Sequence, residues 1–173
     1  MQSQKNQKNK DYNFEDHIHN YAVWTAARAV QRSFVKTQVM QEAIESTRLR
    51  SIITGLEIKT IKQFDEFHDD CCQKIIRFFK KFGIDTSYGR AAKIVSVYIK
   101  TAVVIRDSGK SQVARIAHPP VDNKWLRNLE KEKKQVFVKK PWTNLDRDTY
   151  LKMISDLRNI QGDEFWKLEG AGA

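Results

Sequence analysis

The stretch IIRFFKKFGIDTSYGRAAKIVSVYIKT, residues 75–101, decides the expected fold of this 173-residue chain. Its apolar spacing predicts two helices joined by a turn at 83–89, and the second helix runs over about 90–105. Gly89 lets the backbone approach a partner closely, and the small residues after it let two helices pack tightly. On local pattern alone, an ordinary helical hairpin whose glycine only makes the turn explains this stretch at least as well.

Apolar residues recur at helical spacing on both sides of this stretch. The other expected helices cover about 14–34, 38–53, 60–82, 122–133 and 146–160. Residues 107–112 have the composition of a loop, and residues 135–142 are expected to be irregular or a short strand. No alternating pattern is long enough for a sheet. We therefore expect an all-α fold, with a flexible polar and basic arm at 1–12, a single compact helical domain at 13–168 and a flexible tail at 169–173.

The composition excludes several classes of protein. Hydrophobic residues make up 40% of the chain and charged residues 30%, so a packed core is expected rather than disorder. No apolar run approaches the ~20 residues of a membrane span, and the beginning of the chain lacks the apolar stretch of a signal peptide. Cys71 and Cys72 are the only cysteines and are adjacent, which excludes a disulfide framework and a CxxC metal clip. We expect a soluble, cytoplasmic protein with no membrane partner.

The positive charge of the chain is concentrated in its middle. The chain has 31 Lys and Arg residues against 21 Asp and Glu residues, a net charge of +10. Residues 11–70 contain seven basic and ten acidic residues, whereas residues 73–110 contain nine basic and two acidic residues, a balance of +7. This asymmetry indicates a surface that faces a polyanion, and nucleic acid is the expected partner. The alternative is that the basic residues only keep a small domain soluble.

A second distinctive segment is IAHPPVDNKWLRNL, residues 116–129. Each proline restricts the residue before it, so 118–122 is expected to be extended, with Asp122 at the start of the next helix. Aspartate commonly caps a helix N-terminus by accepting a hydrogen bond from a free backbone N–H. A carboxylate in that place also stays ionised, and it can stabilise an electron-poor sugar carbon or orient an attacking water. The two roles are compatible.

The pattern x-x-G-R-x-A in a helical hairpin, followed by P-V-D at the start of a helix, resembles the helix-hairpin-helix DNA glycosylases. This is the superfamily of endonuclease III and 8-oxoguanine glycosylase, and the resemblance covers about residues 75–130. It implies a hairpin at 84–90 that grips the backbone of double-stranded DNA, and it implies that Asp122 is the catalytic carboxylate. The expected DNA-binding residues are Ser87, Tyr88, Gly89, Arg90 and, because of its charge, Lys100.

The chain departs from that family in its hairpin. The family has glycine-hydrophobic-glycine, whereas this chain has Ser87-Tyr88-Gly89. Bifunctional members carry a nucleophilic lysine two residues after the second glycine, where this chain has Ala91, and Lys93 lies two positions further on, on another side of the helix. Either the hairpin is shifted in register, which leaves Lys93 as the second catalytic candidate, or the enzyme is monofunctional and water attacks the sugar. The four-cysteine iron–sulfur loop of endonuclease III is absent, and we expect neither a cofactor nor a metal.

The first expected helix carries aromatic and polar residues that could hold a flipped base by stacking and hydrogen bonds, or fill the gap that the base leaves. The candidates for this pocket or wedge are His17, Asn20, Tyr21, Trp24, Arg28, Gln31 and, from the segment before Asp122, His118. Ordinary packing and solvation explain the same residues without a function. A metal site would need further ligands, and no second cluster is visible in the sequence.

The leading hypothesis is a DNA glycosylase that binds duplex DNA, flips a damaged or modified base and hydrolyses its N-glycosidic bond. Asp122 would stabilise the positive charge that develops on the sugar. The alternatives are a non-catalytic DNA-binding domain that uses the hairpin and the basic faces, and a small helical interaction module. Residue spacing does not identify the base, so oxidised purines, alkylated bases and the hypermodified bases of phage genomes are all candidates.

Overall fold

Every regular element of the described chain is a helix, which confirms the all-α fold class. The computed structural model describes residues 11–30, 34–162 and 164–172, and no strand occurs within these ranges. The α-helices are α1 (Phe14–Ala29), α2 (Thr37–Glu45), α3 (Ile61–Lys81), α4 (Tyr88–Ile99), α5 (Gln112–Ile116), α6 (Asn123–Lys133) and α7 (Arg147–Gln161). The shorter elements are the 3-10 helices η1 (Leu49–Ile52), η3 (Trp142–Asn144) and η4 (Phe165–Gly172), and the π-helix η2 (Lys100–Ile105).

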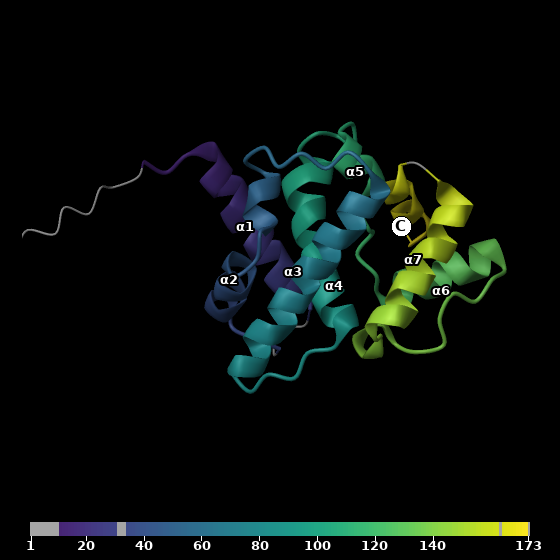
Figure 1. The fold of residues 1–173 in the computed structure, drawn as a ribbon. Coiled ribbons are helices and arrows are strands. Elements are labelled where there is room, and N and C mark those ends of the chain that lie inside the picture. The colour runs from purple at the N-terminus through teal and green to yellow at the C-terminus, as the bar shows by residue number, and fades with distance from the viewer. Residues whose placement is uncertain (1–10, 31–33, 163, 173) are drawn as a thin grey trace, which may run out of the picture.

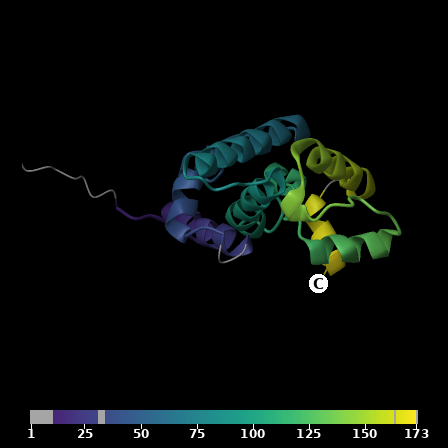
Figure 2. The same cartoon turned by 90° about the horizontal axis from the view of Figure 1, so that it is seen from below.

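Helix α4 lies at the centre of the fold. Figure 1 shows α1 and α2 on one side of it and α6 and α7 on the other, and Figure 2 shows α4 between α1 and α3. Direct contacts join α4 to α1, α3, α7 and η3. Its side chains are buried almost all round, as Ala92, Val95 and Tyr98 illustrate with no exposed surface. A helix that is apolar on every side belongs in a core, and the other helices pack around it.

Ser87 decides where α4 begins. Its Oγ accepts a hydrogen bond from the Arg90 N–H at 3.2 Å, which caps a helix whose first residue is Tyr88. Gly89 therefore lies in the first turn of α4, whereas the sequence placed it in the connecting turn. The conformation that glycine alone adopts easily occurs instead at Gly83, with φ +70° directly after α3.

Helix α4 continues without a break into the π-helix η2. The expected helix over 90–105 therefore keeps its extent but loosens its hydrogen-bond pattern at Lys100. Segments of π-helix are rare and often lie at functional sites. The Thr101 and Thr25 hydroxyls lie 3.0 Å apart, which joins η2 to α1.

The end of the described chain differs most from expectation. Instead of a flexible tail from 169, η4 continues to Gly172. It is held because the Trp125 indole N–H donates to the Leu168 carbonyl at 2.9 Å, and because Glu169 forms an ion pair with Lys100. The first expected helix also ends early, at Ala29, while residues 1–10 of the expected arm lie outside the described residues. None of the described helices is long and apolar enough to cross a membrane.

Candidate active site

Asp122 is the N-cap of α6, as its position after two prolines predicts. Its backbone is extended, with φ −140° and ψ 168°, and its Oδ1 accepts the Trp125 N–H at 2.9 Å. The second carboxylate oxygen, Oδ2, takes no part in this cap and lies 3.6 Å from the Lys93 Nζ. The side chain is 43% exposed. Asp122 thus caps a helix with one oxygen and faces a lysine with the other.

Lys93 approaches this carboxylate from α4. Its side chain is only 10% exposed, and its Nζ lies 4.4 Å from the centre of the Trp142 ring in η3. Burial lowers the pKa of the Lys93 amine, and the charge of Asp122 opposes that lowering. Lys93 consequently releases its proton at a lower pH than a lysine in water.

The Lys93–Asp122 pair lies on the wall of a cavity of about 580 Å³. Helix α4 and η2 form one side of this cavity, and the start of α6, η4 and the last residue of α1 form the others. Its polar lining residues are Lys93, Lys100, Thr101, Asp122, Lys124 and Glu169. The volume falls within the ~300–1,000 Å³ of small-molecule sites. The cavity therefore combines a carboxylate, a buried amine and room for a ligand.

Lys100 lies at this cavity, paired with the carboxylate of Glu169. The expectation of a phosphate contact at Lys100 is therefore modified, because a phosphate would have to compete with Glu169 for the same ammonium group. Both side chains are partly exposed, 37% for Lys100 and 23% for Glu169. The neighbouring Lys124 is exposed and also lines the cavity.

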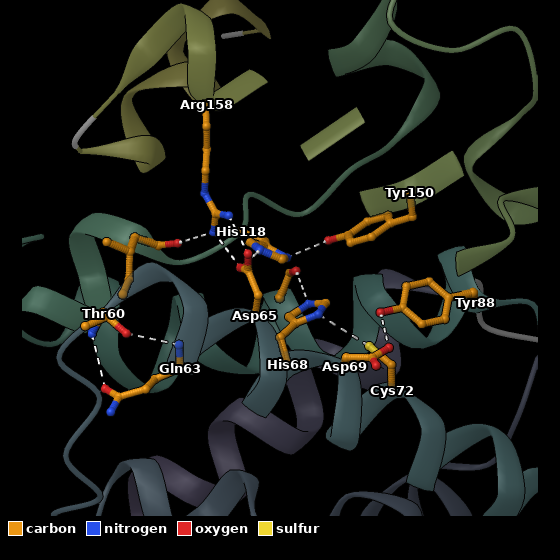
Figure 3. A network of polar contacts seen from close by, with 12 residues as sticks. Thr60, Gln63, Asp65, His68, Asp69, Cys72, Tyr88, His118, Tyr150 and Arg158 are labelled. Atoms are coloured by element: carbon orange, nitrogen blue, oxygen red, sulfur yellow. Dashed lines mark hydrogen bonds and ion pairs between the residues drawn. The ribbon is translucent and has the colours of Figure 1, made fainter. Parts of the chain in front are cut away.

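His118 does not line this cavity, which corrects its assignment to a base pocket. It is buried, and its Nε2 lies 2.9 Å from a carboxylate oxygen of Asp65 on α3. Burial lowers the pKa of the His118 imidazole, so the neutral ring donates from Nε2 to Asp65 and accepts the Tyr150 hydroxyl at Nδ1, at 3.2 Å. Figure 3 shows this arrangement. His118 thus anchors the segment that leads to Asp122.

Asp65 links this anchor to α7. Arg158 donates two hydrogen bonds of 2.7 Å to its carboxylate oxygens, a bidentate pair visible in Figure 3. The hydrogen bonds from His118 and Arg158 hold the pKa of the Asp65 carboxyl well below its usual range, although burial acts in the opposite direction. Beside it, the buried His68 imidazole contacts the Ser96 hydroxyl at 3.3 Å. These polar groups satisfy one another and tie α3, α7 and the segment before α6 together.

Two of the expected DNA-binding residues have internal partners, and for these the expectation is wrong. Tyr88 is buried and donates its hydroxyl to Asp69 at 2.8 Å. Gly89 donates its N–H to the Leu145 carbonyl at 3.0 Å, and a Cβ at this position would lie 1.9 Å from the Trp142 carbonyl oxygen. The close backbone approach predicted for Gly89 therefore exists, but its partner is η3 of the same chain.

Two other expected DNA-binding residues, Ser87 and Arg90, are partly exposed. Ser87 uses its hydroxyl to cap α4, and the Arg90 guanidinium lies 4.8 Å from the centre of the Phe34 ring. Arg90 is half-buried in this position. Neither residue reaches the Lys93–Asp122 cavity. They lie at the N-terminus of α4 and are not parts of the candidate active site.

The residues expected to form a base pocket or wedge on α1 are on its exposed face and do not line the cavity. The members of this group on the exposed face are His17, Asn20, Tyr21, Trp24 and Arg28. The Tyr12 hydroxyl lies 3.3 Å from the His17 Nδ1. Gln31 lies outside the described residues. From α1, only Ala29 lines the cavity, because that side of the helix faces η2.

The described residues hold no group of three or more His, Cys, Asp or Glu side chains placed to bind a metal ion. Cys71 and Cys72 are buried, and burial raises the pKa of the Cys71 thiol to about 12. A thiol with such a pKa is a poor nucleophile near neutral pH. The chemistry available at the cavity is therefore that of an amine and a carboxylate.

Sequence reasoning missed Trp142 and Glu169, which lie far along the chain from Lys93. Trp142 covers the Lys93 amine, and Glu169 pairs with Lys100 at the cavity edge. Neither residue has a motif around it that signals such a role. Their contacts depend on how η3 and η4 pack against α4 and η2.

Comparison of the chain with models of known protein families, with curated proteins and with solved structures found no match.

Proposed function

We propose that this protein is a DNA glycosylase and that base release takes place in the cavity lined by Lys93 and Asp122. The single observation that carries the proposal is the juxtaposition of the Lys93 Nζ and the Asp122 Oδ2, 3.6 Å apart on the wall of a cavity of about 580 Å³. The resemblance of the 75–130 stretch to helix-hairpin-helix glycosylases pointed to Asp122. The contact between the Lys93 and Asp122 side chains is independent support, because the resemblance did not imply it.

In this proposal Asp122 stabilises the sugar as its bond to the base breaks. The departing base withdraws electrons from C1′, and positive charge develops on the sugar ring. Oδ2, which faces Lys93 and the cavity, is suited to stabilise that charge, while the Trp125 N–H holds Oδ1 and so fixes the orientation of the carboxylate. Partial burial strengthens the interaction relative to water.

Lys93 is the proposed nucleophile. Its lowered pKa increases the fraction of neutral amine, which is the reactive form. The amine nitrogen forms a bond to C1′, the bond from C1′ to the base nitrogen breaks, and the electron pair leaves with the base. The proton that the amine loses balances the proton that the base gains. The buried Ala91, which occupies the family's lysine position, offers no such group, so the role falls to Lys93, two positions further along α4.

Charge supports nucleic acid as the substrate. The cavity is lined by three lysines, Lys93, Lys100 and Lys124, against the two carboxylates of Asp122 and Glu169, within a chain of net charge +10. Cationic side chains around a cavity attract a phosphate backbone and raise the rate of encounter. A base flipped out of the duplex could then enter the cavity with its sugar near Lys93.

The test is base release from duplexes that each carry one modified base: an oxidised purine, an alkylated purine, or a hypermodified pyrimidine. After the amine has replaced the base, the sugar ring opens: the nitrogen lone pair forms the C1′=N double bond, the C1′–O4′ bond breaks and O4′ takes up a proton. Sodium borohydride is added in parallel, because its hydride reduces this imine to a stable protein–DNA adduct. Wild-type protein and the control Lys140→Gln are expected to give the adduct, and Lys93→Gln is not. Lys140 suits as the control because it also pairs with a helix-capping aspartate but is 57% exposed.

Two results would count against the proposal. Absence of base release from every duplex, with binding retained, would favour a non-catalytic DNA-binding domain. Base release that persists in Lys93→Gln without any trapped adduct would remove Lys93 as the nucleophile and restore water in that role.

A further inference from the structure

Helix α1 presents an exposed stripe of aromatic and cationic side chains that the proposed reaction does not use. The α1 stripe consists of Phe14, His17, Tyr21, Trp24 and Arg28, which are three or four positions apart and therefore share one face. Phe14 is 70%, Tyr21 56% and Trp24 45% exposed. The opposite face of α1 is buried in the core.

The rings of the α1 stripe are arranged in near-parallel pairs. Tyr21 and Trp24 have ring centres 5.8 Å apart and planes 18° apart, and Phe14 and His17 have centres 6.3 Å apart and planes 21° apart. The Arg28 guanidinium lies 5.2 Å from the centre of the Trp24 ring. Flat, pre-ordered rings with an adjacent guanidinium form a surface suited to stacking other flat groups.

The stripe leads towards the candidate active site. Thr25, beside it on α1, contacts Thr101 of η2, and Ala29 at the end of α1 lines the Lys93–Asp122 cavity. The charges of α1 are unevenly placed along it: Glu15 and Asp16 are in the first turn, whereas Arg28 is in the last turn. An anion bound along the stripe would therefore find its cationic partner at Arg28, one residue before Ala29.

We propose that the α1 stripe binds a single-stranded segment of DNA by stacking its unpaired bases. This inference rests on the proposed function, because flipping a base leaves unpaired nucleotides next to the cavity. Aromatic side chains stack on any base, and a neighbouring cation balances the phosphate charge. Aliphatic side chains, which make the seam of most paired helices, do not occur in the stripe. The occupant that its exposed rings and the Arg28 guanidinium stacked on Trp24 favour is therefore nucleic acid rather than a second copy of this chain.

The test measures binding of a fluorescent oligothymidylate of about 12 nucleotides by anisotropy, a length that covers the usual site sizes. The variant Tyr21→Leu/Trp24→Leu keeps apolar side chains but removes two stacking faces. Its affinity is expected to fall by about tenfold for each ring removed. The matched control, Tyr21→Phe/Trp24→Phe, keeps flat rings and is expected to bind within about threefold of wild type. Thermal melting confirms that both variants fold, as expected for exposed positions.

Three results would overturn the inference. The first is a leucine variant that binds the oligonucleotide as tightly as wild type. The second is a phenylalanine variant that loses affinity as much as the leucine variant, because stacking would then not be the cause. The third is a wild-type dimer in sedimentation that the leucine variant abolishes, because a second copy of the chain would then occupy the stripe.

Base release separates this inference from the proposed function. If the leucine variant loses single-strand binding while no duplex releases a base even with wild-type protein, the stripe binds DNA and the glycosylase proposal fails. If wild type releases a base and the leucine variant binds and reacts normally, the glycosylase proposal stands and the stripe has no such role.

Discussion

The N-termini of α6 and α7 have the same local chemistry in different surroundings. Asp122 and Asp146 each accept a backbone N–H of the first helical turn at 2.9 Å. Each also has its second oxygen near a lysine, at 3.6 Å from Lys93 and at 3.1 Å from Lys140. Lys140 is 57% exposed, whereas Lys93 is 10% exposed and lies on the wall of a cavity.

The comparison teaches that a short ion-pair distance does not mark a functional site. The closer pair, at α7, lies in water, where its charges are screened by solvent and salt. The looser pair, at α6, lies where burial weakens that screening and a ligand has room to enter. The proposed chemistry therefore belongs to the pair at α6, and the pair at α7 serves as the matched comparison.

The largest expected difference between the two caps is catalytic. Asparagine caps a helix about as well as aspartate, so both Asp122→Asn and Asp146→Asn should melt nearly as wild type does. Asp122→Asn removes the charge that we propose faces the sugar and should slow base release by roughly a hundredfold or more, about 3 kcal/mol of barrier. Asp146→Asn should react at the wild-type rate. Single-turnover base release measures both, and equal rates for the two variants would leave Asp122 as a cap alone.

The next largest effect concerns η3, which covers Lys93 and precedes α7. In Gly89→Ala the added Cβ would lie 1.9 Å from the Trp142 carbonyl oxygen, so the backbone must move to relieve the clash. We expect a loss of about 2 kcal/mol in the free energy of unfolding, typical of overpacking. Urea denaturation measures it, and Gly170→Ala is the control because a Cβ there meets nothing within 4 Å. Wild-type stability for Gly89→Ala would mean that η3 is not packed on α4 as described.

A smaller effect, a loss of stability when the capping aspartate is replaced by alanine, is expected to be similar at α6 and α7. Asp122→Ala removes the acceptor for the Trp125 N–H, which costs about 1 kcal/mol of stability. Asp146→Ala removes the acceptor for the Thr149 N–H and should also lower the melting temperature. Calorimetry on the two variants measures both melting temperatures and so tests whether the two caps contribute similarly to stability. A cap at α6 that contributes nothing would show that Asp122 is held only by its partner Lys93.

The smallest expected effect is on the titration of Lys93. Burial lowers its pKa and Asp122 raises it, so Asp122→Asn should lower the Lys93 pKa further. Lys93 keeps its proton to a higher pH in the unfolded chain than in the folded chain. The free energy of unfolding should therefore rise with pH between the pKa of Lys93 in the folded chain and about 10.5, its pKa in the unfolded chain. NMR of the lysine side chains in both proteins measures the shift. A Lys93 pKa that rises in Asp122→Asn would contradict the pairing.

Much of the helical framework followed from local rules that act over one or two turns. The apolar spacing of 60–82 predicts a helix that the structure places at Ile61–Lys81, and Thr60 and Gln63 cap it reciprocally. Asp122 was recognisable as a cap because the prolines before it exclude helix. A helix was predicted through residues 100–105, but the π-helical hydrogen bonding of η2 was not, and the short α5 was not predicted at all.

The sequence by itself determined that the chain is all-helical, where most helices lie, and that Asp122 begins one of them. These properties depend on interactions between residues within a few positions of one another. Only the tertiary structure decided that Lys93 faces Asp122, that Gly89 fits against η3 instead of a phosphate, and that Glu169 returns to Lys100. Each of these contacts joins elements distant in the chain, and its geometry is set by how the whole core packs around α4. No short-range pattern encodes that packing, so the site became visible only when the helices were placed together.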